Sequence, residues 1–322
     1  MTSPLSQPSR TSSRKVSKFT VTLAGTGSAM PVRQRNQSAQ VLDVHGRLFL
    51  VDCGDGLQQN LVRLGVPFTR IDSVFISHIH GDHLFGLFGL LSTLGMGGRT
   101  APLNIFAPVN FGPVLKFFLS FFGDGLAFDI NFKPLKMKAP EVILSAKAYE
   151  VLAFPLNHKI ETFGFIFREK QPLLNVQKWA IERYCMSLAE IGTMKRGEDV
   201  IRPDGGTIAP SEVCYRKYEP LSYAYCSDTA PFPEEVSWLK GVTVLYHEAT
   251  YLDSFAEQAA KRYHSTTLQA ARCALSCGAG KLVIGHFSSR CTDSSLYEAE
   301  CRTIFPDTYA ASDGDVIVLR EG

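Results

Sequence analysis

The densest group of side chains able to do chemistry is a cluster of three histidines and one aspartate, in the segment Ser77-His78-Ile79-His80-Gly81-Asp82-His83. The apolar residues before it predict a buried strand, so His78 and His80, two positions apart, point to the same side. Gly81 then turns the chain into a leucine-rich helix that begins with Asp82 and His83. Imidazole nitrogens with a carboxylate oxygen are ligands that zinc prefers. The alternative, a histidine-rich turn without metal, would leave four ionisable groups to desolvate at high cost.

Further candidate ligands follow other predicted strands. His158 comes after the apolar run Val151–Leu156, Asp228 ends the strand Ser222–Ser227, and His286 ends the run Lys281–Gly285. Each of them alone could be a satisfied core or surface residue. Together they supply enough ligands for two metal ions, which need at least six.

Strand-like runs alternate with helical patterns along the chain, which predicts an α/β fold of two packed sheets flanked by helices. Leucines recur at helical spacing from Leu84 to Leu94, and apolar residues do so from Leu268 to Leu275. The predicted strands are Lys18–Leu23, Val41–Val44, Arg47–Asp52, Ser73–Ser77, Leu103–Phe106, Ser222–Ser227, Thr243–His247, Lys281–Gly285 and Val316–Leu319.

The order and type of these ligands resemble the dinuclear site of the metallo-β-lactamase superfamily, an αββα sandwich. Within that superfamily the chain resembles ribonuclease Z, from about Phe19 to the end. The motifs that carry this resemblance are Gly25-Thr26-Gly27, Arg35-Asn36-x-Ser38, Val51-Asp52-Cys53-Gly54-Asp55-Gly56, Ser227-Asp228-Thr229, His247-Glu248-Ala249-Thr250, His264-Ser265-Thr266 and His286-Phe287-Ser288-Ser289-Arg290. The elements at His247 and His264 point to the nuclease branch. The resemblance implies a zinc-dependent endoribonuclease in which a metal-bound hydroxide removes the 3′ trailer of precursor tRNA and leaves a 3′-hydroxyl.

The resemblance also implies roles for individual residues. One zinc ion would be held by His78, His80 and His158, the second by Asp82, His83 and His286, and Asp228 would bridge the two. Asp82 would also accept a proton from the attacking water. Asp52 is expected to orient a ligand histidine, although a plain turn aspartate remains the alternative.

His264 is the predicted donor of a proton to the leaving oxygen, and Glu248 is predicted to hold it protonated. The alternatives are an exposed loop histidine and a surface acid. Arg290, four residues after a ligand, is expected to bind a phosphate oxygen, with a surface salt bridge as the alternative.

The segment from Arg168 to Ser211 is predicted to be an arm-like insertion in a domain that spans residues 18–322. The four-residue step of Val176, Ala180, Tyr184 and Leu188 predicts a helix inside it. Ribonuclease Z enzymes carry a tRNA-binding arm here, often with a Gly- and Pro-rich tip that this chain lacks. Lys195 and Arg196 are candidate phosphate contacts, or else a solvated pair of charges. The aromatic run Val114–Phe122 is expected to pack in the core, with a homodimer surface as the alternative.

Composition narrows these hypotheses only modestly. With 33 Lys+Arg against 31 Asp+Glu, net charge gives no sign of a nucleic-acid partner. Residues 1–17 read as a flexible, basic, Ser-rich tail. The eight cysteines predict reduced thiols in a cytoplasmic protein, and Cys273 and Cys277 lack a second pair to complete a zinc site. No apolar run is long enough to cross a membrane. The rival functions are hydrolysis of a small phosphodiester, sulfate ester or lactone, and a non-catalytic RNA-binding subunit.

Overall fold

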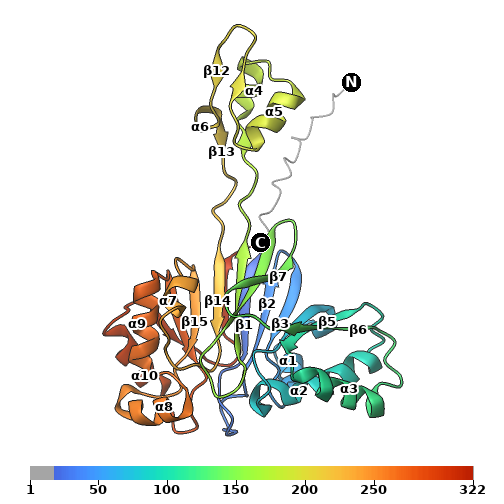
Figure 1. The fold of residues 1–322 in the computed structure, drawn as a ribbon, viewed down its shortest axis with the longest axis vertical. Helices are drawn as coiled ribbons and strands as arrows, with labels where there is room; N and C mark the ends of the chain where they lie inside the picture. Colours follow the sequence, from blue (N-terminus) through green and yellow to red (C-terminus); the bar gives the residue numbers. More distant parts are fainter. Residues whose placement is uncertain (1–17, 322) are drawn as a thin grey trace, which may run out of the picture.

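Two seven-stranded sheets lie face to face at the centre of the molecule in a computed structural model that describes residues 18–321 (Figure 1). The first sheet has the order β18-β1-β2-β3-β4-β5-β6: Val316–Arg320, Phe19–Gly25, Ala39–Val44, Arg47–Val51, Ile71–Phe75, Leu103–Pro108 and Ile130–Leu135. The second has the order β17-β16-β15-β14-β9-β8-β7: Thr308–Ala310, Lys281–Gly285, Val244–Glu248, Ser222–Cys226, Phe163–Glu169, Tyr149–Pro155 and Glu141–Ser145. Both sheets are mixed, since each joins a parallel half to an antiparallel half.

Aromatic side chains fill the space between the sheets. The Phe75 ring on β4 lies 5.4 Å from that of Phe165 and 5.3 Å from that of Phe167, both on β9. The Phe49 ring on β3 lies 5.6 Å from that of Phe167. These edge-on and tilted contacts between large buried rings hold the two sheets together.

Helices cover the outer faces of both sheets. Those over the first sheet are α1 (Leu57–Arg63), α2 (Gly81–Met96) and α3 (Phe111–Phe122), with the short helix η1 (Phe68–Arg70). Those over the second are α7 (Glu235–Trp238), α9 (Thr267–Cys277) and α10 (Ser294–Arg302), while η2 (Asp253–Phe255) and α8 (Ala256–Arg262) lie near one end of that sheet (Figure 1). The predicted αββα sandwich is confirmed.

Core packing explains only part of helix α3. Phe111 and Leu115 are buried in it, but Phe117, Phe121 and Phe122 are 67%, 66% and 64% exposed. The expectation that the whole aromatic run packs in the core is therefore wrong, because the helix is apolar on more faces than the sheet can cover. Exposed apolar surface of this kind is typical of interaction sites.

An arm projects from the second sheet between β9 and β14 (Figure 1). Its elements are β10 (Asn175–Val176), α4 (Lys178–Arg183), α5 (Leu188–Lys195), β11 (Val200–Ile201), β12 (Thr207–Ile208), α6 (Pro210–Val213) and β13 (Cys214–Tyr215). A small core of its own includes Val176, Met194 and Val213, so the arm extends past Ser211.

The prediction of a helix inside the arm is confirmed by α4, but the four-residue step from Val176 to Leu188 does not follow one continuous helix. Val176 lies in a strand, α4 ends at Arg183, and Cys185 has a left-handed φ of 44°. A new helix starts after Ser187, which forms a capping box with Glu190 and so favours a fresh N-terminus there. Leu188 is 88% exposed, because it lies outside the packed face that its spacing suggested.

The predicted tail, residues 1–17, lies outside the described residues. Among the described residues, no helix is both long and apolar enough to cross a membrane.

Candidate metal centre

The predicted histidine cluster lies where strand β4 passes into helix α2. His78 and His80 follow the strand, and Asp82 and His83 occupy the first turn of the helix. The helix is held against the loop after β3, because the Cys53 N–H donates to the His83 carbonyl at 2.7 Å. Gly86 permits this approach, since a Cβ there would lie 2.1 Å from the Gly54 carbonyl oxygen.

The structure brings together all seven residues predicted as metal ligands. They form two groups, each with donor atoms within 4.8 Å of one another: His78, His80, His158 and Asp228 in the first, and Asp82, His83 and His286 in the second. In the second group, Nε2 of His83 and Nε2 of His286 each lie 3.4 Å from Oδ2 of Asp82. Ligands about 2.0 Å from a tetrahedral zinc ion lie roughly 3.3 Å apart, so this spacing suits one ion.

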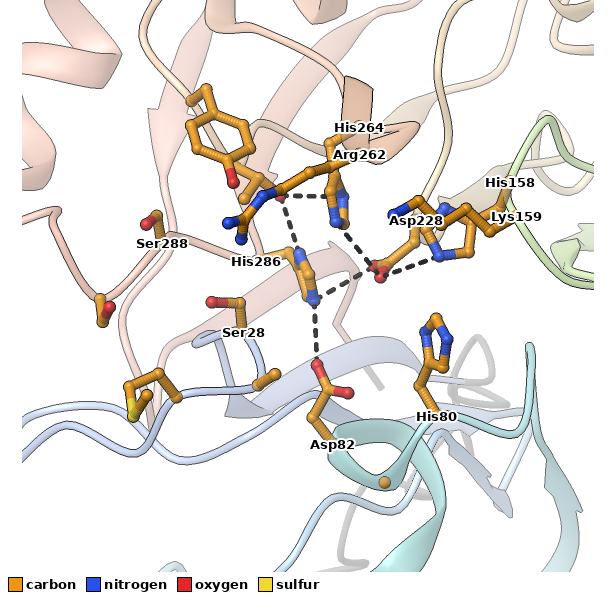
Figure 2. Close-up of a pocket in the computed structure, with 16 residues that line it drawn as sticks. Ser28, His80, Asp82, His158, Lys159, Asp228, Arg262, His264, His286 and Ser288 are labelled. Atoms are coloured by element: carbon orange, nitrogen blue, oxygen red, sulfur yellow. Dashed lines mark hydrogen bonds and ion pairs between the residues drawn. The ribbon is translucent and has the colours of Figure 1, made fainter. Parts of the chain in front are cut away.

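Asp228 lies between the two groups (Figure 2). Its Oδ1 atom is 3.4 Å from Nε2 of His83 and 3.1 Å from Nε2 of His286. Its Oδ2 atom is 3.7 Å from Nε2 of His78 and 3.9 Å from Nε2 of His158. One carboxylate thus presents one oxygen to each group, as a bridging ligand does.

Hydrogen bonds on the outer ring nitrogens orient four of the histidines. His158 donates from Nδ1 to the Tyr263 carbonyl at 2.9 Å. Nδ1 of His78 lies 3.0 Å from Ser77 Oγ, and Nδ1 of His286 lies 2.9 Å from Thr250 Oγ1. Both hydroxyls give their own protons to carboxylates, so each accepts from the imidazole. Nε2 of these rings is then left to face inward.

Asp52 holds the fourth histidine. Its Oδ2 atom accepts from Nδ1 of His83 at 2.7 Å and from the Tyr225 hydroxyl at 2.7 Å, while Oδ1 accepts from the Ser77 N–H at 2.7 Å. Asp52 and His286 both have left-handed backbones, with φ of 56° and 58°. Such conformations cost about 1–3 kcal/mol and cluster at functional sites.

Electrostatics favour neutral imidazoles in one group and a cation in the other. Burial, reinforced by the neighbouring His83, holds the pKa of His78 well below its usual range. Burial opposes charge on His83 too, but the carboxylates of Asp228, Asp82 and Asp52 outweigh it and raise the pKa. The negative field that stabilises a proton on His83 would equally stabilise a metal ion.

Two buried atoms test whether metal ions fit this centre. Nε2 of His158 and Oδ1 of Asp228 are buried without a hydrogen-bond partner, although His286 lies 3.1 Å from the latter. Buried polar atoms are rarely left unpaired. Each is a lone-pair donor aimed at the middle of its group, so a borderline cation such as zinc would satisfy both.

His264 and Glu248 lie beside the two groups. Nδ1 of His264 donates to Oε1 of Glu248 at 2.8 Å, which leaves Nε2 facing the centre, 4.0 Å from Oδ2 of Asp228. Glu248 also accepts from the Thr229 N–H and the Thr250 hydroxyl, at 3.0 and 2.7 Å. Burial opposes charge on His264, but Glu248 and Asp228 outweigh it and raise the pKa to about 9.

The centre lies on the floor of a cleft of about 750 Å³ (Figure 2). Two cations that the sequence did not single out, Lys159 and Arg262, line this cleft, as do Ser28 and Ser288. Arg290 does not line it and instead borders a smaller neighbouring pocket that shares Ser288. The phosphate-binding role of Arg290 therefore stays a prediction.

Comparison with known proteins places the chain in a family. A family model described as "Anti-Pycsar protein Apyc1" matches residues 19–112. Ribonuclease Z of Bacteroides fragilis is 39% identical over 302 residues, covering 94% of this chain and 99% of that protein. Ribonuclease Z of Cytophaga hutchinsonii is 40% identical over 297 residues, covering 92% and 95%. The chain belongs to the ribonuclease Z family.

Solved structures agree with this assignment. Human tRNase Z, short form, superimposes with a TM-score of 0.69 at 25% identity and covers 94% of this chain and 100% of its own. The metallo-β-lactamase fold protein YhfI of Bacillus subtilis has a TM-score of 0.65 at 17% identity, covers 94% of this chain and 99% of its own, and supports the fold alone. The chain thus has the metallo-β-lactamase fold and is, by its family, a metal-dependent endoribonuclease.

The loop that leads to Ser28, a residue lining the cleft, is held by Asp313, which the sequence did not single out. Asp313 accepts from the Thr26 hydroxyl and from the Asn36 side-chain amide, both at 2.7 Å. Arg35 donates to Thr26 Oγ1 at 2.7 Å, and its guanidinium lies 4.5 Å from the Phe287 ring centre. Thr26, Arg35 and Asn36 carried the family resemblance, but nothing in the sequence signalled their partner almost 300 residues later.

Proposed function

We propose that this chain is an endoribonuclease that removes the 3′ trailer of precursor tRNA by hydrolysing one phosphodiester bond, with two zinc ions per chain. The observation that carries the proposal is the pair His264–Glu248 beside the carboxylate of Asp228, which faces both ligand groups. A proton donor next to two ion sites suits a reaction whose leaving group is a poor one, such as a ribose 3′-oxygen.

The roles of the ligands follow from their arrangement. We assign His78, His80 and His158 to one ion, Asp82, His83 and His286 to the other, and Asp228 to both. When bound, two such ions supply a nucleophile at neutral pH and neutralise charge on the phosphate oxygens. Asp82 lies in the first turn of α2, with Oδ2 aimed at two imidazoles, and is placed to accept a proton from the attacking water.

The departing 3′-oxygen takes its proton from Nε2 of His264. That nitrogen faces the cleft, because Nδ1 is committed to Glu248. Glu248 is itself fixed by bonds from Thr229 and Thr250, so the imidazole cannot swing away without leaving a buried negative charge without its cationic partner. Lys159 and Arg262 border the same cleft and are placed to hold the phosphate backbone on either side of the cut.

We further propose that the enzyme is a cytoplasmic homodimer whose contact is the exposed face of α3. Phe117 and Phe121, whose rings are 5.0 Å apart, are both about two-thirds exposed. A second copy would bury these aromatic side chains, and aromatic residues are enriched in interfaces. Replacing both with glutamate should convert a dimer to a monomer in sedimentation analysis, whereas a monomeric wild-type chain would refute this contact.

The test of the activity is incubation with a tRNA transcript that carries a 3′ extension, followed by mapping of the cut. We expect cleavage after the 3′ end of the tRNA body, a 3′-hydroxyl on the tRNA, and loss of activity in a chelator that zinc restores. A small bis-phosphodiester serves as the comparison substrate. Rapid turnover of that compound with no cleavage of the transcript would support the rival small-molecule hydrolase instead.

A further inference from the structure

A second cluster of metal-ligand side chains lies behind the catalytic centre. Cys226 ends β14, Glu235 begins α7 and His247 lies in β15. One donor atom from each lies within 4.8 Å of the other two, and the three side chains are 0%, 2% and 1% exposed. None of the three belongs to the ligand groups of the catalytic centre. A thiol, a carboxylate and an imidazole gathered in a core need a reason to be there.

The imidazole of His247 shows where a cation would bind. Its Nδ1 atom lies 2.6 Å from the Glu248 carbonyl oxygen, which can only accept, so Nδ1 carries a proton. Its Nε2 atom faces Oε1 of Glu235 at 3.1 Å. A neutral imidazole would turn a lone pair toward an ionised carboxylate. Burial opposes charge on His247, but Glu235 outweighs it and raises the pKa of His247, so either a second proton or a metal cation between the two groups makes the contact attractive.

Two more thiols border the cluster. Cys273 and Cys277, four residues apart on helix α9, are 6% and 2% exposed, and α9 packs against both α7 and β15 (Figure 1). Neither sulfur belongs to the group of donor atoms that the other three residues form. Both are free and lie in the hydrophobic core of the second sheet, which confirms the prediction from the sequence.

We propose that Cys226, Glu235 and His247 bind a structural ion of the zinc class. Zinc accepts sulfur, nitrogen and oxygen ligands, and buried structural sites commonly include cysteine. Binding displaces the thiol proton of Cys226, and charge on the ion balances the proton lost.

The site would clamp the two strands that deliver catalytic residues. Cys226 lies two residues before Asp228, and His247 immediately precedes Glu248. Strands β14 and β15 pair in parallel, with Cys226 opposite His247. One ion bound to both strands and to helix α7 would fix the register that aligns Asp228 with Glu248. This inference does not depend on which nucleic acid the enzyme cuts.

Sulfur distinguishes this site from the catalytic centre, whose seven proposed ligands offer only nitrogen and oxygen. The whole chain, stripped of metal and reconstituted with cobalt(II), should show a sulfur-to-cobalt charge-transfer band in the near ultraviolet. X-ray absorption of the zinc-loaded chain should show a shell at about 2.3 Å, the zinc–sulfur distance, beside the shorter nitrogen and oxygen shell. Neither measurement needs a variant or an activity assay.

Variants locate the site. Cys226→Ser should abolish the charge-transfer band, because Cys226 supplies the sulfur of the cluster. Cys301→Ser is the matched control, because Cys301 is equally buried but donates to the Thr267 carbonyl at 3.2 Å, outside the cluster, and should keep the band. If the wild-type chain binds cobalt and cleaves RNA without that band, or if the band survives Cys226→Ser, the proposal is wrong. The proposed nuclease function would be untouched by either result.

Discussion

The metal centre and the arm lie at opposite ends of the same two strands. Strand β9 starts soon after His158 and ends at Glu169, where the arm begins, and β14 leads back from the arm to Asp228. Seven residues of extended strand separate the two regions by roughly 23 Å. The centre is buried and tied together by ionisable side chains, whereas the arm has a small core and many exposed side chains.

This difference indicates a division of labour. Residues of the centre are fixed by hydrogen bonds from several elements, so each substitution there should affect chemistry on any substrate. The arm contacts none of the proposed ligands and should affect only substrates long enough to reach it. Precursor tRNA and a small phosphodiester therefore report on different parts of the molecule.

The largest effect is expected from a ligand of the centre. Loss of a residue that only orients a ligand weakens metal binding by about 10–100-fold. Loss of the ligand itself should cost more, so His80→Ala should weaken metal binding by more than about 100-fold and abolish cleavage of both substrates. Metal analysis after dialysis measures the first effect. His45→Ala is the matched control, since that histidine bonds to Glu169 at the root of the arm and should leave the metal content unchanged. Normal metal content in His80→Ala would remove it from the ligand set.

The next largest effect concerns the proton donor. His264→Ala should slow cleavage of precursor tRNA by about 10²–10⁴-fold, the usual contribution of a positioned general acid, without loss of metal. A nitrophenyl phosphodiester, whose leaving group departs without a proton, should lose far less. Glu248→Gln should reproduce the defect more mildly. Because Asp228, His264 and His286 also form a close group of donors, loss of metal would instead make His264 a ligand.

An intermediate loss of metal affinity or activity is expected from Asp52, which holds a proposed ligand histidine. Asp52→Asn should reduce metal affinity or activity by about 10–100-fold, because an amide cannot hold Nδ1 of His83 as a carboxylate does. The effect should be similar for both substrates. Asp72→Asn, on a neighbouring strand but bonded to exposed Arg47, should show neither loss. Equal behaviour of the two variants would make Asp52 a plain turn residue.

The smallest effect is expected from single charges on the arm. Arg196 pairs with Glu198 at 2.9 Å, and both side chains are more than half exposed. Replacing Lys195 and Arg196 together with alanine should raise KM for precursor tRNA at most roughly fivefold, the equivalent of about 1 kcal/mol. The small substrate should be unaffected. The same change at two other exposed lysines, Lys133 on strand β6 and Lys136 just after it, should leave both values unchanged. An equal loss there would show that the arm charges have no special role.

The two regions also differ in how far the sequence predicts them. The ligand cluster is predictable because strand, turn and helix geometry fix where His78 to His83 point. The Tyr263 carbonyl, Lys159 and Arg262 were missed because they lie on loops or helix ends, where no period constrains direction. In the arm, apolar residues at every fourth position predicted a helix, but the chain turns at Cys185 between two short helices. A small isolated core favours such short elements. The sequence could not predict that part of the apolar surface of α3 is exposed, because the spacing of apolar residues does not show what packs against them.

The most direct test of the division of labour is removal of the arm. In a chain where residues Gln171 to Gly197 are replaced by a short flexible linker, kcat/KM should be measured for precursor tRNA and for the small phosphodiester. The account predicts a large fall for precursor tRNA, caused by a higher KM, and an unchanged value for the small compound. Equal falls for both substrates, or an unchanged value for precursor tRNA, would contradict it.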